Sequence, residues 1–383
     1  MKIVHLCLSC FFIDNYSYQE NLLPKYHVKQ GNDVTVIASL YTFGEDGMGY
    51  YLPRPSTYYD KNGFKVIRLG YKKPLFVYER LRRYVGFRDV LEQEAPDLIF
   101  IHGVSFADAT IVRDYKETHP HTIVFADSHT DFINSGKNFL SRTVLHSIIW
   151  RHYAKVLEPL LEKCYGVTPL RCKFLKDVYH IRDEKISFLP MGIDDEIIPR
   201  NKKEVKAQVR SELGIQVTDR VIFTGGKIDK LKNTHILLDS LDLVKKEDLH
   251  LIICGVLTPE MSYLADVISE RSKKVHYLGW CNAERVINCM IASDIACFPG
   301  THSTLWEQSV GMGLPSIFKR WDDMEHVNVN GNCLFVKGED PVELKDCIEE
   351  LLNEGRREYY DQKAQEASKS FLYSEISKKA IEF

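Results

Sequence analysis

A lysine-rich loop between an apolar run and a helical pattern is the first candidate for chemistry. The stretch FTGGKIDKLKN, residues 223–233, places Gly225, Gly226, Lys227 and Lys232 there. Glycines let the backbone turn sharply and approach a ligand, the N-terminus of the next helix favours an anion, and lysines add positive charge. The loop therefore predicts a pyrophosphate site, although a solvated surface loop has the same composition. It has neither the Walker spacing nor G-x-G-x-x-G, which disfavours an ATPase or a dehydrogenase.

The second candidate is Glu307, in the stretch FPGTHSTLWEQSVGMGLP over residues 298–315. This pattern predicts a strand end, a turn and a short helix. A carboxylate in the first turn of such a helix can accept hydrogen bonds from both hydroxyls of a ribose. The spacing from Thr304 to Glu307 also fits a capping box, in which the glutamate bonds back to the cap residue. From the residues alone, both interpretations stay open.

Two histidines follow apolar runs in the first half of the chain. His102 ends LIFIH, and His129 ends TIVFADSH. Asp127 and Asp131 flank His129 and could orient it or raise its pKa. A histidine in such a place is more often a hydrogen-bonded packing residue, so catalysis by His129 is a hypothesis.

The elements that must position these residues alternate along the whole chain. Short runs rich in Val, Ile, Leu and Phe are separated by helical patterns, as in parallel sheets covered by helices on both faces. Because 383 residues exceed one ordinary core, we expect an α/β fold with two Rossmann-like doubly wound domains, 1–195 and 196–365. ISFLPMG, residues 186–192, is interpreted as a crossover, and 366–383 as a C-terminal helix that could pack back on the first domain.

Composition excludes several other classes of protein. A formal charge of -3 gives no reason to expect nucleic-acid binding, and no run of about eighteen apolar residues could span a bilayer. The start MKIVHLCL reads directly into a strand, so we expect a cytoplasmic protein. Ten scattered cysteines indicate free thiols in a reducing compartment. Cys7 and Cys10 have redox or metal spacing, but they lack the matching context.

On these stretches the chain resembles the retaining glycosyltransferases of family 4, which have the GT-B fold and hold a nucleotide-sugar in a cleft between two Rossmann-like domains. Other matching pieces are GNDVTVIAS, PDLIFIHG, FLPMGID, VHYLGW and DIACFPG. The resemblance puts Lys227 and Lys232 in the place of the basic pair that contacts the donor pyrophosphate, and Glu307 in that of the ribose-binding glutamate. It implies donor binding by Gly225, Gly226, Lys227, Lys232, Trp280, His302, Ser303, Thr304, Leu305 and Glu307.

The resemblance also implies a mechanism. Catalysis would involve His129, Lys227 and Lys232, with the leaving phosphate accepting the proton of the acceptor, and no metal or other cofactor would be required. Trp280 would meet the nucleobase by stacking, or else it is a core residue. The donor would be a UDP-sugar.

Two departures from the family concern the sugar and the acceptor. Pro299 stands eight residues before Glu307, where the family has its sugar-reading glutamate, and His302 is the candidate replacement. The first loop reads FIDNYSYQENL instead of carrying a Gly-Gly turn, which indicates specialised acceptor recognition. The residues expected on the acceptor side are Tyr18, Gln19, His102 and Asp131.

The acceptor would be a saccharide or a polyprenyl-linked saccharide in cell-surface polysaccharide synthesis. Basic amphipathic segments over 76–93 and 136–164 could lie on the inner face of the membrane, or could be ordinary domain helices. Two other functions stay open. One is a sugar-nucleotide epimerase of the same fold, and the other is a noncatalytic nucleotide-sugar-binding subunit of a glycan assembly complex.

Overall fold

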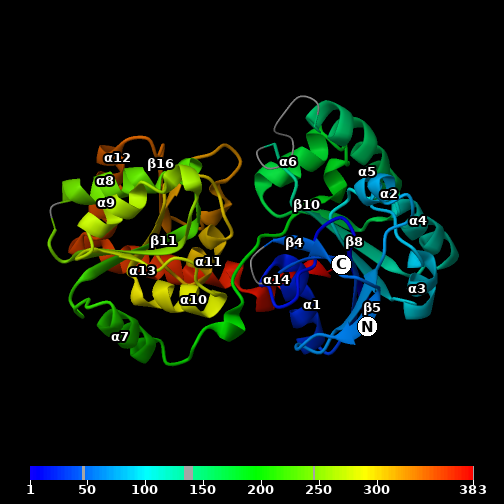
Figure 1. Ribbon diagram of the computed structural model, residues 1–383, viewed down its shortest axis with the longest axis horizontal. Helices are drawn as coiled ribbons and strands as arrows, with labels where there is room; N and C mark the ends of the chain where they lie inside the picture. The colour runs from blue at the N-terminus through cyan, green and yellow to red at the C-terminus, as the bar shows by residue number, and fades with distance from the viewer. Residues whose placement is uncertain (45–47, 133–140, 245, 383) are drawn as a thin grey trace. The chain divides into compact units, whose positions relative to one another are not determined.

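The computed structural model describes residues 1–44, 48–132, 141–244 and 246–382, with only the backbone of 141–144 (Figure 1). The chain divides into two compact units, Met1–Pro190 with Ile376–Phe383, and Met191–Glu375. Both units are α/β, as predicted.

The first unit is built on an eight-stranded sheet in the order β10-β9-β8-β7-β1-β2-β6-β5. Its strands are parallel except for β5, which pairs antiparallel with β6 at the edge. The strand bounds are β1 (Lys2–Cys7), β2 (Asp33–Ser39), β5 (Ser56–Tyr59), β6 (Lys65–Leu69), β7 (Leu98–His102), β8 (Ile123–Ser128), β9 (Lys163–Gly166) and β10 (Ile186–Phe188). A separate hairpin pairs β3 (Tyr41–Phe43) with β4 (Gly49–Tyr51).

Helices follow the strands of the first unit, as the parallel topology requires. They are α1 (Gln19–Lys29), α2 (Leu75–Leu81), α3 (Phe87–Glu94), α4 (Ala109–Thr118), the π-helix η1 (Ser141–Trp150), α5 (Arg151–Leu157) and α6 (Pro169–Asp177). Every residue of β7 is buried, because helices cover this central strand on both faces.

The second unit has a six-stranded parallel sheet in the order β13-β12-β11-β14-β15-β16. The strands are β11 (Arg220–Ile228), β12 (Leu249–Leu257), β13 (Val275–Tyr277), β14 (Ile295–Phe298), β15 (Ser316–Lys319) and β16 (Cys333–Val336). The helices are α7 (Lys202–Glu212), the short η5 (Lys230–Lys232), α8 (Thr234–Val244), α9 (Leu264–Glu270), α10 (Ala283–Ala292), α11 (Leu305–Gly311), the short η7 (Glu325–Val327), α12 (Pro341–Leu351), α13 (Glu354–Ser368) and α14 (Tyr373–Ala380), which runs into the first unit.

Alternation along the strands builds two cores in the second unit. Ile222 packs with α8, α9 and α12, whereas the next residue, Phe223, packs with α10, α11 and α13. Figure 1 shows these two groups of helices on opposite faces of the sheet. Because successive side chains of a strand point to opposite faces, near-continuous apolar runs feed both cores. This sandwich fixes the loops at the carboxyl ends of the strands.

Two expectations about elements were wrong, and one group of strands was missed. The crossover segment contains β10, which pairs in parallel with β9. The strands β3 to β5 have too many polar and aromatic residues to read as apolar runs. Most relevant for the site, β11 continues through Gly225 and Gly226 to Ile228, so these glycines lie in the strand and the turn comes after them. A Cβ on Gly225 would lie 2.4 Å from the carbonyl oxygen of Cys254 on β12, which explains the glycine.

Candidate functional site

Two loops of the second unit meet at the carboxyl edge of its sheet. The loop after β11 contains Lys232, and the loop after the neighbouring strand β14 contains Thr301 and His302. Lys232 Nζ donates hydrogen bonds to the carbonyl oxygens of Thr301, at 2.6 Å, and His302, at 3.0 Å. A Cβ on Gly300 would come within 2.3 Å of the Lys232 backbone, so only glycine permits this approach. The fold thus unites the two stretches singled out in the sequence.

Burial changes the acid–base behaviour of Lys232. It lowers the pKa of the Lys232 ammonium to about 8, while nearby Asp229 acts in the opposite direction. The ammonium donates to the carbonyl oxygens of Thr301 and His302, which carry no charge. A half-buried cation with neutral partners gains more from an added anion than an exposed lysine does.

The other donor-side candidates differ in exposure. Lys227 is exposed near the end of β11. Trp280 is 76% exposed in the loop after β13, so its interpretation as a core residue was wrong. Its ring face is available for stacking. Thr304 is exposed at the start of α11, while Ser303 and Leu305 are half-buried.

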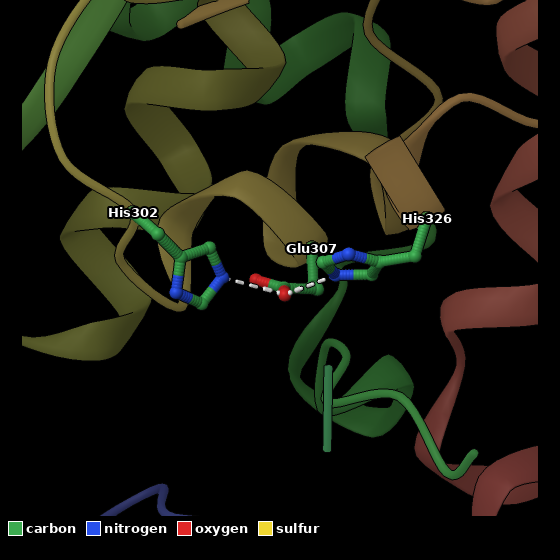
Figure 2. Close-up of side chains that lie close together, drawn as sticks. All are labelled: His302, Glu307 and His326. Atoms are coloured by element: carbon green, nitrogen blue, oxygen red, sulfur yellow. Dashed lines mark hydrogen bonds and ion pairs between the residues drawn. The ribbon is translucent and has the colours of Figure 1, made fainter. Parts of the chain in front are cut away.

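Glu307 is the centre of a buried cluster. Its side chain is 0% exposed, and Figure 2 shows it between His302 and His326. Nε2 of His302 lies 2.7 Å from Oε1 of Glu307, and Nε2 of His326 lies 2.8 Å from the same oxygen. Burial opposes ionisation of the carboxyl, but the two histidines hold the pKa of Glu307 well below its usual range.

The capping-box interpretation of Glu307 was wrong. Thr304 already has helical backbone angles, φ -57 and ψ -16, and it makes no side-chain capping bond to the described residues. Glu307 instead turns towards the two histidines. Its second oxygen, Oε2, is buried and has no hydrogen-bond partner within the described ranges. That oxygen is the atom that a ribose hydroxyl would have to reach.

Among the residues that the structure describes, His302, Glu307 and His326 also form a group that could hold a metal ion. One ligand atom from each of His302, Glu307 and His326 lies within 4.8 Å of the others. Two imidazoles and a carboxylate are ligands that Zn²⁺ accepts. His326 escaped the sequence-based interpretation, because it follows the polar segment WDDME and belongs to no recognised spacing.

In the first unit, Gln19 and His102 both bond to Asp127. Gln19 Nε2 donates to Asp127 Oδ2 at 3.1 Å, and His102 Nδ1 lies 2.8 Å from the same oxygen. His129 is close by, with its Nε2 3.8 Å from Asp127 Oδ2 and its side chain 31% exposed. Gln19 and His102 are buried, so neither presents its side chain to solvent.

The two remaining acceptor-side candidates lie in different surroundings. Asp131 is buried and accepts a hydrogen bond from Arg171 Nε at 3.1 Å. This ion pair ties the segment after β8 to α6, which gives Asp131 a structural contact. Tyr18 is exposed at the N-terminus of α1, and its ring lies 5.3 Å from that of Tyr16.

A pocket of about 580 Å³ lies in the first unit, and none of the predicted donor or acceptor residues lines it. Aromatic rings follow one another along its wall, each 4.5 to 6.2 Å from the next. Arg82 lies over the Trp150 ring at 5.2 Å. The lining residues are Leu8, Ser9, Cys10, Phe11, Tyr41, Tyr51, Tyr71, Glu79, Arg80, Arg82, Tyr84, Leu145 and Trp150. The aromatic residues are dispersed over the sequence, so no motif reveals them.

The two basic segments are helical where they are described. Residues 76–93 form α2 and α3, and residues after 140 form η1 and α5, whereas 136–140 lie outside the described residues. Leu75 and Phe76 on α2 are exposed. Among the described helices, none combines the length and the apolar character needed to cross a membrane.

Comparison with known proteins places this site in a family segment. Residues 218–354 match the family model of Glycosyl transferases group 1, and this segment contains Lys227, Lys232, Trp280 and Glu307. No curated protein matches the chain.

Solved structures resemble the whole chain. Sucrose-phosphate synthase from Thermosynechococcus elongatus has 14% identity and a TM-score of 0.68, with 99% of this chain and 97% of that chain covered. Anabaena HepE in complex with UDP has 15% identity and a TM-score of 0.67, with 99% and 98% covered. A putative UDP-N-acetylglucosamine 2-epimerase from Listeria monocytogenes has 14% identity and a TM-score of 0.63, with 98% and 94% covered.

At these identities the likeness establishes the fold. The chain has the GT-B fold, with two Rossmann-like domains, as predicted. The matched family segment supports a domain of the Glycosyl transferases group 1 kind over residues 218–354.

Proposed function

We propose that this chain transfers a sugar from a nucleotide-sugar donor and that the loop with Lys227 and Lys232 binds the donor diphosphate. The observation that carries the proposal is the bonding of Lys232 Nζ to the carbonyls of Thr301 and His302 at the carboxyl edge of the second sheet. Such an edge is where α/β sheets bind ligands. A diphosphate would supply the counter-charge that the half-buried ammonium lacks in these two bonds.

The proposed chemistry is electrostatic. When the glycosidic bond to the donor breaks, negative charge grows on the diphosphate, and the two ammonium groups stabilise it. The reaction proceeds with retention of anomeric configuration, and the departing phosphate accepts the proton of the acceptor hydroxyl. It needs no metal. His129 positions the donor sugar and does not act as a proton acceptor.

The nucleobase is proposed to be uracil, stacked on Trp280. The 76% exposed indole offers a ring face of the kind that nucleobases stack on. The similar HepE protein is known in complex with UDP, which supports the same nucleotide here. His302, Ser303, Thr304 and Leu305 then surround the donor near the start of α11. Glu307 reaches the ribose only if its buried Oε2 becomes accessible.

The pocket of the first unit is proposed to bind the acceptor. Its wall of tyrosines and phenylalanine provides flat apolar faces with hydroxyl groups at their edges, which suit the two faces of a sugar ring. Arg80 and Arg82 add positive charge to the lining. The acceptor is a saccharide, free or attached to a lipid, and exposed Leu75 and Phe76 beside these arginines suit a membrane surface.

Nucleotide binding tests this function directly. Thermal unfolding would be followed with UDP, GDP, ADP and dTDP, each with and without EDTA, because a specific ligand raises the apparent stability. Lys232→Ala removes the partly buried ammonium, and Lys230→Ala removes an exposed one two residues away. We expect UDP to stabilise the wild type and the Lys230 variant, but not the Lys232 variant. Equal stabilisation of both variants would refute the proposed site.

An epimerase is the second candidate, because one of the similar structures is a putative UDP-N-acetylglucosamine 2-epimerase. Product analysis separates the two activities. A transferase yields UDP and a glycosylated acceptor and depends on that acceptor, whereas an epimerase converts a nucleotide-sugar, or releases a rearranged sugar, without one. Binding of the donor without either product would identify a noncatalytic subunit.

A further inference from the structure

Three buried histidines of the first unit form a continuous row. His5 on β1 has its Nδ1 3.0 Å from His102 Nε2 and its Nε2 3.0 Å from His27 Nδ1 on α1. One end of the row is the Asp127 carboxylate, 2.8 Å from His102 Nδ1. The other end is the backbone carbonyl of Ser377 on α14, 2.9 Å from His27 Nε2. All three imidazoles are 0% exposed.

Counting protons along this row gives a definite result. The row has four hydrogen bonds, and each bond needs one proton between its two heavy atoms. The carbonyl of Ser377 can only accept, so His27 Nε2 must carry a proton. Three neutral imidazoles bring three protons in total. One bond therefore remains unmade unless the row holds a fourth proton, wherever along the row that proton lies.

We propose that His102, His5 and His27 hold one proton more than three neutral imidazoles and that this proton fastens the C-terminal segment around Ser377 to the first unit. The extra positive charge is balanced by Asp127 inside the row. Without the fourth proton, two lone pairs face each other at one position. The unmade bond costs least at the end between His27 Nε2 and the carbonyl of Ser377. At the other end, the negative charge of Asp127 strengthens the bond to His102.

Other bonds hold the same segment and provide a comparison. Gln30 Nε2 donates to Ser377 Oγ at 2.7 Å, and Tyr165 Oη donates to the carbonyl of Lys379 at 3.0 Å. These bonds need no extra proton, since an amide and a phenol are donors when neutral. The bond from His27 alone among these three ties attachment of the segment to protonation.

The electrostatics agree with the proton count. Burial opposes a charge on His102, but the Asp127 carboxylate beside it raises the pKa of His102 to about 9. Burial lowers the pKa of His27 to about 4, while its bond to the Ser377 carbonyl acts in the opposite direction. Burial is also the main reason that the pKa of His5 is lowered. The extra proton thus resides mainly on His102.

The titratable groups around the row come from several elements. None of them except His129 can be cationic, and those that are anionic when ionised favour a proton on His102. They are Cys7 on β1, Cys10 after it, Glu20 on α1, Asp127 and His129 at the end of β8, and Cys164 on β9.

The sign of the pH effect follows from the two states of the row. When the segment is free, water can donate to His27 Nε2 and a neutral row is satisfied, so the free row holds the fourth proton less tightly than the docked row does. Docking is therefore strongest while the docked row keeps that proton, and it weakens as the pH rises towards the His102 pKa of about 9. At a pH where the free row has lost the fourth proton and the docked row has kept it, docking takes up one proton. Docking of residues 376–382 should therefore weaken by about threefold to tenfold per pH unit.

NMR of the protein with isotopically labelled histidines would detect the extra proton directly. At pH 7.5 we expect one buried imidazolium signal in the wild-type chain. His5→Leu interrupts the row and leaves a protonated His102 with a buried Nε2–H that has lost its acceptor, which opposes the effect of Asp127. The imidazolium signal should therefore be lost at a lower pH than in the wild type. His27→Leu removes the group that accepts from His5, and it replaces the first variant if that one does not fold. His27→Gln keeps an N–H donor towards the Ser377 carbonyl and should retain the signal. Three neutral rings in the wild type would overturn the proposal.

Hydrogen exchange of residues 376–382 between pH 7 and pH 9, corrected for intrinsic rates, would test the fastening. In the wild type, the opening equilibrium constant of residues 376–382 should rise several-fold for each pH unit. In His5→Leu it should not depend on pH. Tyr165→Phe is the matched control, because it removes a neutral bond to the same helix. It should open more at every pH and keep the trend. Opening of the wild type that does not depend on pH would overturn the proposal.

Discussion

Each unit contains a buried carboxylate bonded to histidines, and the two arrangements differ. In the second unit, His302 and His326 both donate to one oxygen of Glu307, so the histidines act in parallel. In the first unit, only His102 contacts Asp127 among the three histidines of the row, and the others follow in series. The parallel cluster is satisfied by neutral imidazoles, since each contributes one N–H. The series ends on a carbonyl and needs an additional proton.

The difference shows that distance and burial do not by themselves determine the charge of a histidine cluster. The number of protons that a cluster needs depends on whether the groups at the ends of its hydrogen-bond path can donate or only accept. The bonds of the parallel cluster need no proton beyond those of two neutral imidazoles, whereas the series needs one more, which pairs Asp127 with an imidazolium. Three predictions test this contrast, and a further one tests the Lys232 loop beside the parallel cluster.

The largest effect is expected for Asp127→Asn. This change removes the anion that balances the extra proton and places an amide among the donors Gln19 Nε2, His102 and the backbone N–H of Gly103. Breaking a buried pair leaves an uncompensated charge, which costs about 3–5 kcal/mol. Urea unfolding would measure the loss. Asp114→Asn on the exposed surface of α4 is the control and should change stability by less than about 1 kcal/mol.

A smaller loss is expected for Glu307→Gln. The amide oxygen can still accept from both His302 and His326, so the bonds shown in Figure 2 persist. The new NH₂ group takes the place of Oε2, which has no partner among the residues described, and an unsatisfied buried donor costs about 1–3 kcal/mol. Urea unfolding beside the exposed control Glu325→Gln measures it. A loss as large as that of Asp127→Asn would contradict the parallel arrangement.

The third prediction concerns the loop that Lys232 ties to His302. Its pKa of about 8 means that the free protein loses this positive charge as the pH rises above 8, while a bound diphosphate raises the pKa. Affinity for UDP should be nearly constant up to about pH 7, should be about halved at pH 8 and should then fall by up to about tenfold per pH unit. Calorimetric titration measures it. Lys232→Arg, which stays charged, should abolish the decline; the same decline in that variant would exclude Lys232 as its cause.

Much of the fold follows from sequence because its signals are local. The apolar runs that predicted parallel strands are buried by helices on both sides, and β14 ends at Phe298, as the pattern FPG predicts. The polar, aromatic strands β3 to β5 were missed because they do not line a two-sided core. Gly225 was placed in a turn because glycine is typical of turns, whereas here the close neighbouring strand requires it.

The site was only partly predictable, for a physical reason. Lys232 and Glu307 belong to short motifs and could be found, although the motif did not reveal that Glu307 is enclosed by His302 and His326. The members of the histidine row, such as His5 and His27, are separated along the chain and come together only through strand register and helix packing. Proton counts depend on such three-dimensional paths, so they cannot be read from spacing.

The smallest effect on stability is expected when metal ions are removed, because the distances in the Glu307 cluster are too short for a bound metal ion. The two nitrogen–oxygen distances of 2.7 and 2.8 Å are those of hydrogen bonds. Ligands bound to Zn²⁺ at about 2.1 Å with tetrahedral angles lie about 3.4 Å apart. A metal would therefore have to push the imidazoles away from Glu307 within a packed core. We expect EDTA to leave the melting temperature unchanged and Zn²⁺ at equimolar concentration not to raise it. Stabilisation by Zn²⁺ that His326→Gln abolishes would instead make the cluster a metal site, and the parallel arrangement would then be the ligand set of that ion.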